Sequence, residues 1–178
     1  MSWVQKMADL KYKFSWNLLG DINIGRPNLG PNTRLEVYRL MQGTFREVLE
    51  QRFGTDMADQ IFYESGKLAG EHFFKHVIGD VQDFSQLAKA LEQSMLNLGI
   101  GVLRIEESDF NKGTFVLTVA EDLDCSGLPE LGYEICTYDE GFIAGIFETF
   151  TGKAFSVKEI DCWCTGERTC RFEAKFVI

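Results

Sequence analysis

The spacing of apolar residues changes near residue 100. Before it, apolar side chains recur every three or four positions, which is typical of helices with one buried face; after it, short runs alternate with polar residues, as in strands. The pattern predicts these elements: helices over 33–53, 55–78, 83–98 and 132–150, strands over 101–107 and 114–121, and a last hairpin within 154–178. This order, ααα-ββ-α-ββ, predicts an α+β domain with an antiparallel sheet and helices packed on one face.

Capping residues and glycines indicate where the first helix starts and where another backbone can approach a helix closely. Thr33-x-x-Glu36 has the form of a capping box and predicts the start of the first helix. Gly66 and Gly70 lie one turn apart inside the second helix, where a glycine costs about 1 kcal/mol relative to alanine. We therefore expect another backbone to approach the second helix closely at this pair. Gly141 and Gly145 repeat the spacing in the fourth helix.

The first 32 residues precede this pattern. Apolar residues alternate there at Tyr12, Phe14, Trp16 and Leu18, which indicates a short strand or an arm that packs elsewhere. Residues 21–32 are rich in glycine, proline and asparagine and are expected to form an ordered surface loop. We therefore separate an N-terminal arm and loop, residues 1–32, from a single domain, residues 33–178, which the family resemblance given below implies to be ligand-binding.

Composition narrows the class of protein. The chain has 178 residues with 45% apolar and 25% charged side chains, which suits one soluble domain with a substantial core. A net charge of −9 without a cluster of basic residues argues against binding to nucleic acid or to an anionic membrane. We find no signal peptide and no apolar run long enough to span a bilayer, so we expect a cytoplasmic protein. In that reducing compartment, five cysteines are expected to be metal ligands and spare thiols rather than disulfides.

The candidate chemistry lies near the C-terminus, where three cysteines fall within nine positions. A tight turn between Cys162 and Cys170 brings their side chains close together, which suits the zinc–sulfur bonds of a tetrahedral site. Glu159 lies on the same strand, and an irregularity near the turn can direct its carboxylate to the same point. Cys136 is the first candidate for a further ligand, and Cys164 is its rival because residues two apart on a strand share a face. The alternatives are buried thiols that act as small hydrophobic side chains, or a Cys164–Cys170 disulfide.

The same residues carry a resemblance to a known family. Cys136-x22-Glu159-x2-Cys162-x7-Cys170, with glycines at 141, 145 and 166, resembles the signature of the 4-vinyl reductase (4VR) domain family. Its members include sensor domains of aromatic-responsive transcriptional activators and a bacteriochlorophyll-synthesis protein. The resemblance implies a structural zinc bound by Cys136, Glu159, Cys162 and Cys170, which clamps the last helix to the last hairpin. Cys164 departs from the family pattern and is expected to be a competing ligand or a redox-sensitive neighbour.

The resemblance also implies a pocket for a small hydrophobic or aromatic molecule. Apolar cavities with aromatic walls hold such ligands, and the chain has fifteen phenylalanines. The candidates lie on elements expected to meet in the core: Phe73, Phe84, Phe115, Phe142, Phe147 and Phe155. Plain core packing is the alternative. Family members that sense phenols hold the hydroxyl through a histidine and a tryptophan that have no match here, so we expect a less polar ligand.

Other candidate sites are weaker. His72 and His76 lie four residues apart on one helix face, but a metal or haem iron would need a third ligand. The acidic stretches 106–107 and 121–124 lack a partner base or nucleophile and are expected to be solvated edge charges. The chain has no phosphate loop, nucleophile elbow or dinucleotide fingerprint, which argues against a nicotinamide-dependent reductase.

We therefore predict a zinc-containing domain that binds or senses a small hydrophobic molecule. It is expected to act as a homodimer or through a separate signalling partner, and the N-terminal arm and first helix are the candidate dimer surface. One alternative, which follows from the family name, is a vinyl reductase or reductase subunit acting on a tetrapyrrole. A second is a structural scaffold like the vesicle-tethering subunits, which share the family's fold distantly, as do haem nitric-oxide-binding domains.

Overall fold

Backbone contacts divide the chain into two units, Met1–Thr33 and Arg34–Ile178. The computed structural model describes residues 11–177. Within the first unit, the alternating segment forms no strand; it leads into a 3-10 turn, η2 (Trp16–Leu19). The predicted surface loop contains a one-turn helix, α1 (Ile22–Gly25), because the Asp21 carboxylate accepts a hydrogen bond from the Ile24 amide at 3.1 Å. The part of the predicted arm before residue 11 lies outside the described residues.

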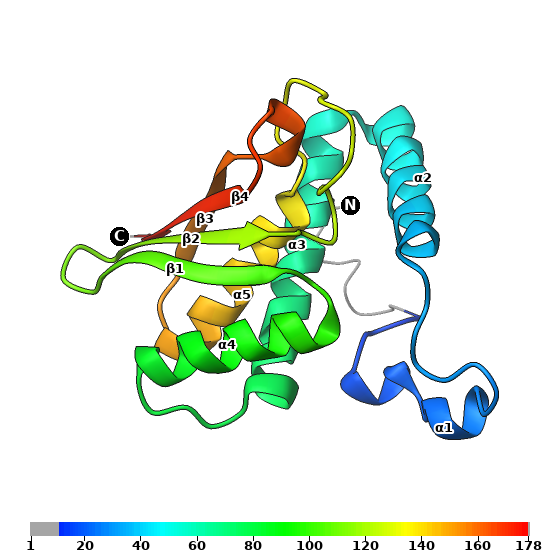
Figure 1. The fold of residues 1–178 in the computed structure, drawn as a ribbon, viewed down its shortest axis with the longest axis horizontal. Coiled ribbons are helices and arrows are strands. Elements are labelled where there is room, and N and C mark those ends of the chain that lie inside the picture. Colours follow the sequence, from blue (N-terminus) through cyan, green and yellow to red (C-terminus); the bar gives the residue numbers. More distant parts are fainter. Residues whose placement is uncertain (1–10, 178) are drawn as a thin grey trace. The chain divides into compact units, whose positions relative to one another are not determined.

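The second unit contains the predicted sequence of elements (Figure 1). They are α2 (Leu35–Phe53), α3 (Thr55–Phe73), the π-helical turn η3 (Phe74–Ile78), α4 (Phe84–Leu98), β1 (Val102–Asp109), β2 (Thr114–Ala120), α5 (Thr137–Thr151), β3 (Phe155–Asp161), the 3-10 turn η4 (Trp163–Thr165) and β4 (Cys170–Phe176). The order ααα-ββ-α-ββ is confirmed. Among the described residues, no helix is both long and apolar enough to cross a membrane.

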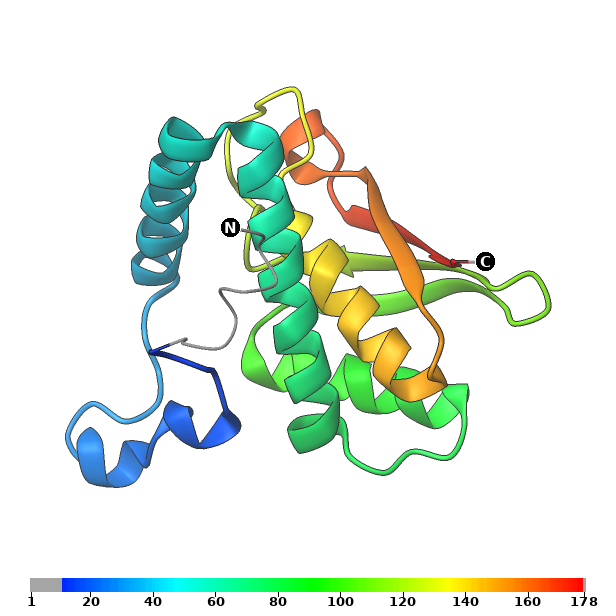
Figure 2. The same ribbon diagram turned by 180° about the vertical axis from the view of Figure 1, so that it is seen from behind.

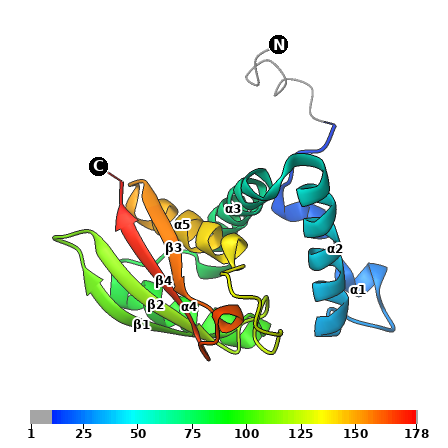
Figure 3. The same ribbon diagram turned by 90° about the horizontal axis from the view of Figure 1, so that it is seen from above.

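The four strands form one antiparallel sheet in the order β1-β2-β4-β3. The two hairpins therefore meet along β2 and β4 at the centre of the sheet. Alternate residues of the β3–β4 hairpin are buried, namely Phe155, Val157 and Glu159 of β3 and Cys170, Phe172 and Ala174 of β4. This alternation is that of a sheet covered on one side. Figure 3 shows α4 and α5 on that side, with α3 beyond α5, so the predicted packing on one face is confirmed.

Helices α3 and α5 pack through the two glycine pairs. A Cβ atom built on Gly66 would lie 2.0 Å from the Tyr138 carbonyl oxygen, and one on Gly70 would lie 2.1 Å from that of Phe142. The contact is reciprocal, because Cβ atoms built on Gly141 and Gly145 would lie 2.0 and 2.1 Å from backbone oxygens of α3. The close approach expected from Gly66 and Gly70 is therefore confirmed. The partner backbone belongs to α5 (Figure 2).

The predicted capping box at the start of α2 is wrong. The helix begins at Leu35, and its N-cap residue is Arg34, whose side chain makes no capping hydrogen bond. The Glu36 carboxylate is engaged instead by the Arg34 guanidinium, with Nε donating at 3.2 Å. An ion pair between neighbours thus replaces the reciprocal bonds that a capping box would make with Thr33.

Helix α5 begins at Thr137 and not at Gly132 as predicted. The amides of Leu131 and Gly132 donate to the Cys164 carbonyl at 2.8 and 3.0 Å, so this backbone is bound to the last hairpin and is not free to coil. Gly132 also has φ of 82°, which lies outside the right-handed helical region. Residues 121–136 are consequently an irregular loop between β2 and α5, called here the β2–α5 loop.

Candidate metal centre and apolar groove

Four cysteine sulfurs meet beneath the tip of the β3–β4 hairpin. The Sγ atoms of Cys125, Cys136, Cys162 and Cys170 all lie within 4.8 Å of one another, and all four side chains are fully buried. Cys136 Sγ is 4.0 Å from both Cys162 Sγ and Cys170 Sγ, and Cys125 Sγ is 3.1 Å from Cys170 Sγ. Three of the four residues are those predicted from the sequence; Cys125 is the addition.

Each sulfur comes from a differently fixed piece of backbone. Cys125 lies in the β2–α5 loop, where its amide donates to the Asp122 carboxylate at 3.1 Å. Cys136 is the N-cap residue of α5. Cys162 follows β3, and Cys170 opens β4. A group bound to these sulfurs would therefore join the loop, the last helix and the last hairpin.

The donor set fits a tetrahedral soft metal ion. Sulfurs about 2.3 Å from a tetrahedral zinc lie about 3.8 Å from one another, close to the two separations from Cys136. The Cys164 amide donates to Cys162 Sγ at 3.4 Å, as expected when that sulfur carries negative charge. Hydrogen bonds from the thiols of Cys125, Cys136 and Cys170 lower the pKa of Cys162. The thiolate is the form that binds metal, so this cluster can hold a metal ion.

Glu159, the predicted carboxylate ligand, borders the four sulfurs. Its Oε2 accepts a hydrogen bond from the Cys136 amide at 3.1 Å, and its buried Oε1 has no hydrogen-bond partner among the described residues. Burial, followed by the charges of Cys162 and Cys170, raises the pKa of Glu159 to about 10. The strand register shifts just after Glu159, which confirms the expected irregularity. The fourth member of the sulfur group is Cys125, whereas the sequence suggested Glu159 as the fourth ligand. Glu159 as a ligand stays a prediction.

Cys164 has a structural role in the hairpin. Its sulfur is not part of the four-sulfur group, although the side chain is buried. Its carbonyl accepts the two amides of the β2–α5 loop described above. The alternative of a Cys164–Cys170 disulfide is wrong, because both residues are free thiols.

A second buried carboxylate holds β3 against α5. Oε1 of Glu140 accepts hydrogen bonds from the Glu159 amide at 2.8 Å and from Lys158 Nζ at 2.9 Å. Glu140 lies in the first turn of α5, where a negative charge is favourable. This contact fixes the strand at the residue that borders the cysteine cluster.

Replacing Glu140 by alanine is expected to lower the free energy of unfolding by about 1–3 kcal/mol, because the buried Glu159 amide loses its acceptor. Urea titration followed by circular dichroism measures the change. Lys158→Met is the control: it removes only the ion pair with an exposed lysine and should cost less than about 1 kcal/mol. Equal losses for the two variants would assign the effect to the ion pair.

The rings of the six predicted pocket phenylalanines contact one another in two sets: Phe73 with Phe142, and Phe84, Phe115, Phe147 and Phe155 together. Centroid separations are 5.0 Å for Phe73–Phe142, 5.2 Å for Phe84–Phe115, and 5.4 Å for both Phe115–Phe147 and Phe147–Phe155. All six belong to the main hydrophobic core or pack against it. A ligand among these rings would have to separate them, and the pocket there stays a prediction.

An open apolar groove of about 400 Å³ lies between α2 and α3. Its walls are formed by Tyr38, Met41, Gln42, Phe45, Ile61, Phe62, Ser65 and Tyr138. None of the six predicted phenylalanines lines it. The apolar stripe of α2 had indicated a buried helix face, but only Leu49 of α2 is buried, and Met41 and Phe45 are more than half exposed. The groove has the size and lining of sites that bind small molecules.

The predicted solvated edge charges are exposed at Glu106, Glu107 and Glu121, but the prediction is wrong for Asp122 and Asp124. Asp122 and Asp124 are buried, at 2% and 5% exposure. Asp122 accepts hydrogen bonds from the amides of Asp124 and Cys125, and Asp124 accepts from side chains of α2. Burial and the charge of Asp124 raise the pKa of Asp122 to about 7.

His72 and His76 stack with ring centroids 5.8 Å apart, and neither joins a metal-capable group in the described part of the chain.

The fold and the site together define an α+β domain whose last hairpin meets a helix and a loop at a cluster of buried thiols. Residues 115–176, from β2 to the end of β4, match the family model of the V4R domain. The match confirms, for this segment, the family resemblance in the sequence, and a vinyl-4-reductase family protein is among the similar solved structures.

Known relatives extend the similarity beyond that segment. The uncharacterized protein MJ1642 of Methanocaldococcus jannaschii is 27% identical over 149 residues, which cover 84% of this chain and 81% of the relative. The phenol-responsive sensory domain of the transcription activator PoxR, solved with phenol, has a TM-score of 0.62 at 18% identity, covering 83% of this chain and 78% of that one. A vinyl-4-reductase family protein from Methanocaldococcus jannaschii has a TM-score of 0.57 at 18% identity, with coverages of 84% and 85%.

Proposed function

We propose that this protein is a small-molecule-binding domain of the sensory type whose C-terminal half is held together by zinc. The observation that carries the proposal is the convergence, within a V4R fold, of four buried cysteine sulfurs from three segments. The likeness in fold to a phenol-responsive sensory domain supports the ligand-binding part. Five free thiols are in keeping with the reducing, cytoplasmic environment expected from the sequence.

The cysteine residues would act as a structural clamp. Bound zinc would supply a rigid tetrahedral link without an open coordination position for water. Cys136 would fix the start of α5, Cys162 and Cys170 would fix the two strands of the hairpin, and the fourth ligand would come from Cys125 or Glu159. A clamp of this kind gives the ligand-binding domain, residues 33–178, one defined arrangement of helix, loop and hairpin.

Ligand occupancy would be passed to a second copy of the chain or to a separate signalling protein. Helix α2 supports this part of the proposal, because its apolar side chains are largely exposed: Val37, Leu40, Met41, Phe45, Val48 and Phe53. Exposed apolar surface on this scale is typical of interaction sites. A homodimer through α2 and the N-terminal arm is the arrangement we favour.

Native mass spectrometry of protein purified without added metal tests the proposal. We expect one zinc per chain, a dimer, and an additional mass from a small organic ligand that mild activation releases. A bound tetrapyrrole would favour the vinyl-reductase alternative, and a zinc-loaded dimer without any ligand would favour a structural scaffold. Protein that is folded but contains no metal would contradict the clamp.

A further inference from the structure

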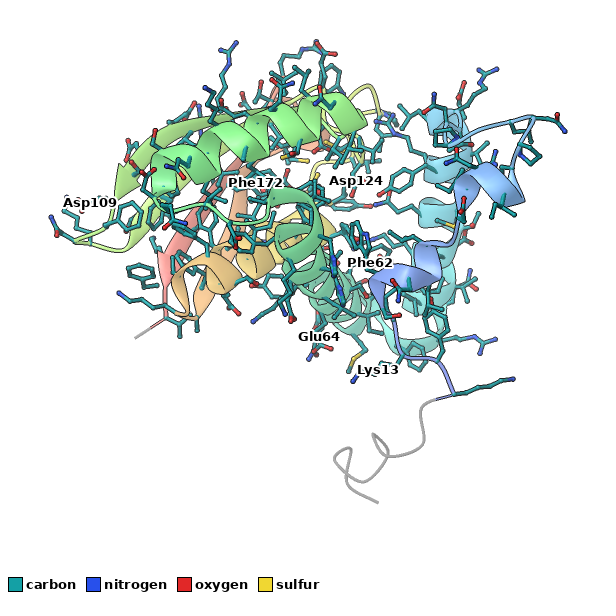
Figure 4. The ribbon with its side chains drawn as sticks, turned by 90° about the horizontal axis from the view of Figure 1, so that it is seen from below. Lys13, Phe62, Glu64, Asp109, Asp124 and Phe172 are labelled. Atoms are coloured by element: carbon teal, nitrogen blue, oxygen red, sulfur yellow. The ribbon has the colours of Figure 1, made fainter. Side chains whose placement is uncertain are left out.

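The groove between α2 and α3 has an apolar floor and a polar end. Met41, Phe45, Ile61 and Phe62 form the apolar part, and the rings of Phe45 and Phe62 meet edge to face at 6.2 Å. Tyr38 and Gln42 lie where the groove approaches the β2–α5 loop. In Figure 4, Phe62 and Asp124 both lie on the side of the domain that faces α2.

The polar end of the groove presents acceptors. The Tyr38 hydroxyl and the Gln42 amide nitrogen each donate to the Asp124 carboxylate at 2.7 Å. The Ser65 hydroxyl donates to the Ile61 carbonyl at 2.7 Å. The Gln42 carbonyl oxygen and the Ser65 lone pairs therefore remain to receive a hydrogen bond. A carboxylate behind them repels an anion and favours a neutral molecule that carries a donor.

Helix α2 is also attached to the loop that carries Cys125. Besides the two bonds to Asp124, Arg39 Nε donates to the Leu123 carbonyl at 2.9 Å, and Arg39 Nη2 donates to that of Ser126 at 2.9 Å. These acceptors lie within two residues of Cys125, whose sulfur belongs to the cluster. The segment 123–126 therefore contacts both sites: it is hydrogen-bonded to α2, which forms one wall of the groove, and it carries Cys125 of the cluster.

We infer that the α2–α3 groove is the binding site for a neutral, mainly apolar small molecule with one hydrogen-bond donor, and that residues 123–126 couple this site to the cysteine cluster. The inference rests on the proposed function and gives it a location other than the phenylalanine core. A ligand fills the space between the helices, places its donor at Gln42 or Ser65, and fixes α2 against the loop. Metal at the cluster fixes the same loop from the other side.

Three matched probes test the ligand class by fluorescence titration of the metal-loaded protein. 2-Naphthol carries the donor, 2-methoxynaphthalene keeps the size and the oxygen but lacks the donor, and 2-naphthoate is anionic. One hydrogen bond is worth about 0.5–1.5 kcal/mol, so 2-methoxynaphthalene should bind about 2- to 13-fold more weakly than 2-naphthol. 2-Naphthoate should bind most weakly. Equal affinity for all three, or no binding of 2-naphthol, overturns the inference.

Two substitutions on α3 test the location. Ser65→Phe places a ring in the groove and should weaken 2-naphthol binding at least about tenfold, since it removes most of the space for a bicyclic ligand. Glu64→Phe adds the same ring at the neighbouring exposed position, which does not line the groove, and should leave the affinity unchanged. If Ser65→Phe binds 2-naphthol like the wild type, the site lies elsewhere. The proposed function is tested separately, by the co-purified ligand that native mass spectrometry is expected to detect.

The coupling has its own test. If the loop links the two sites, saturating 2-naphthol should raise the zinc affinity, measured in competition with a chromogenic chelator, by the same factor by which zinc raises the affinity for 2-naphthol. Tyr38→Phe removes one link between α2 and Asp124 and should reduce both factors together. Factors of one in the wild type overturn the coupling. A factor as large in Tyr38→Phe as in the wild type contradicts coupling through this segment.

Discussion

Replacing Cys162 by serine is expected to abolish stoichiometric zinc binding and to unfold the β3–β4 hairpin and the β2–α5 loop. Structural zinc contributes about 10–16 kcal/mol of apparent binding free energy in small sites, whereas whole domains are stable by about 5–15 kcal/mol. Losing the metal should therefore remove most of the stability of this half of the domain. Elemental analysis gives the zinc content, and near- and far-ultraviolet circular dichroism with thermal unfolding gives the structural loss.

Cys164→Ser is the matched control, because this buried thiol lies two residues away and outside the four-sulfur group. It should keep one zinc per chain and cost no more than a conservative core substitution, below about 1.5 kcal/mol. Zinc loss in both variants would mean that Cys164 takes part in binding. Full zinc stoichiometry and an unchanged thermal midpoint in Cys162→Ser would show that the proposed ligand set is wrong.

Two further variants separate the possible ligand sets. With four sulfurs as ligands, Cys125→Ser loses zinc, and Glu159→Gln keeps it because the Cys136 amide can still donate to the side-chain amide oxygen. With the set implied by the family resemblance, the outcomes are reversed. The Sγ atom of Cys125 lies within 4.8 Å of the other three sulfurs, which makes the first outcome the expected one.

The sequence predicted the type and order of the main elements because each carries its own periodicity and its own terminal glycine or capping residue. The error at the start of α5 occurs where a distant contact decides the backbone. The predicted helix began at Gly132, yet the amides of Leu131 and Gly132 bind the Cys164 carbonyl, and α5 starts only at Thr137. No local pattern contains that information.

The same difference between local patterns and distant contacts explains which residues of the cysteine cluster were predicted. Cys136, Cys162 and Cys170 were predicted because two of them flank one turn and the family signature includes all three. Cys125 was missed because its position depends on the sheet: Val119 of β2 pairs with Cys170 of β4, so the loop after β2 runs close to that cysteine. Knowledge that the two hairpins pair through β2 and β4 would have been enough to predict Cys125 as a member of the cluster. The groove was missed because an apolar stripe on α2 does not show whether it is covered.

Replacing Gly66 or Gly70 by alanine is expected to destabilise the domain by about 3 kcal/mol or more, the upper part of the range for overpacked cores. The new methyl group would lie 2.0–2.1 Å from a backbone carbonyl oxygen of α5, whereas ordinary contact begins at 3.4 Å. Because both surfaces are helix backbone, no side chain can turn away to relieve the clash. Chemical denaturation measures the loss. Gly43→Ala, in an interior position of α2 with no atom within 4 Å of the new Cβ, should instead stabilise by about 0.5–1 kcal/mol.

The two substitutions in α3 should also differ in their effect on zinc. Gly66 meets the carbonyl of Tyr138, two residues after Cys136, whereas Gly70 meets that of Phe142, a full turn further along α5. To make room at Gly66, the start of α5 must move and carry the Cys136 sulfur away from those of Cys162 and Cys170. Gly66→Ala is therefore expected to weaken zinc binding more than Gly70→Ala at similar loss of stability. Equal zinc affinities in the two variants would contradict this, and would show that the four sulfurs keep their arrangement when the start of α5 moves.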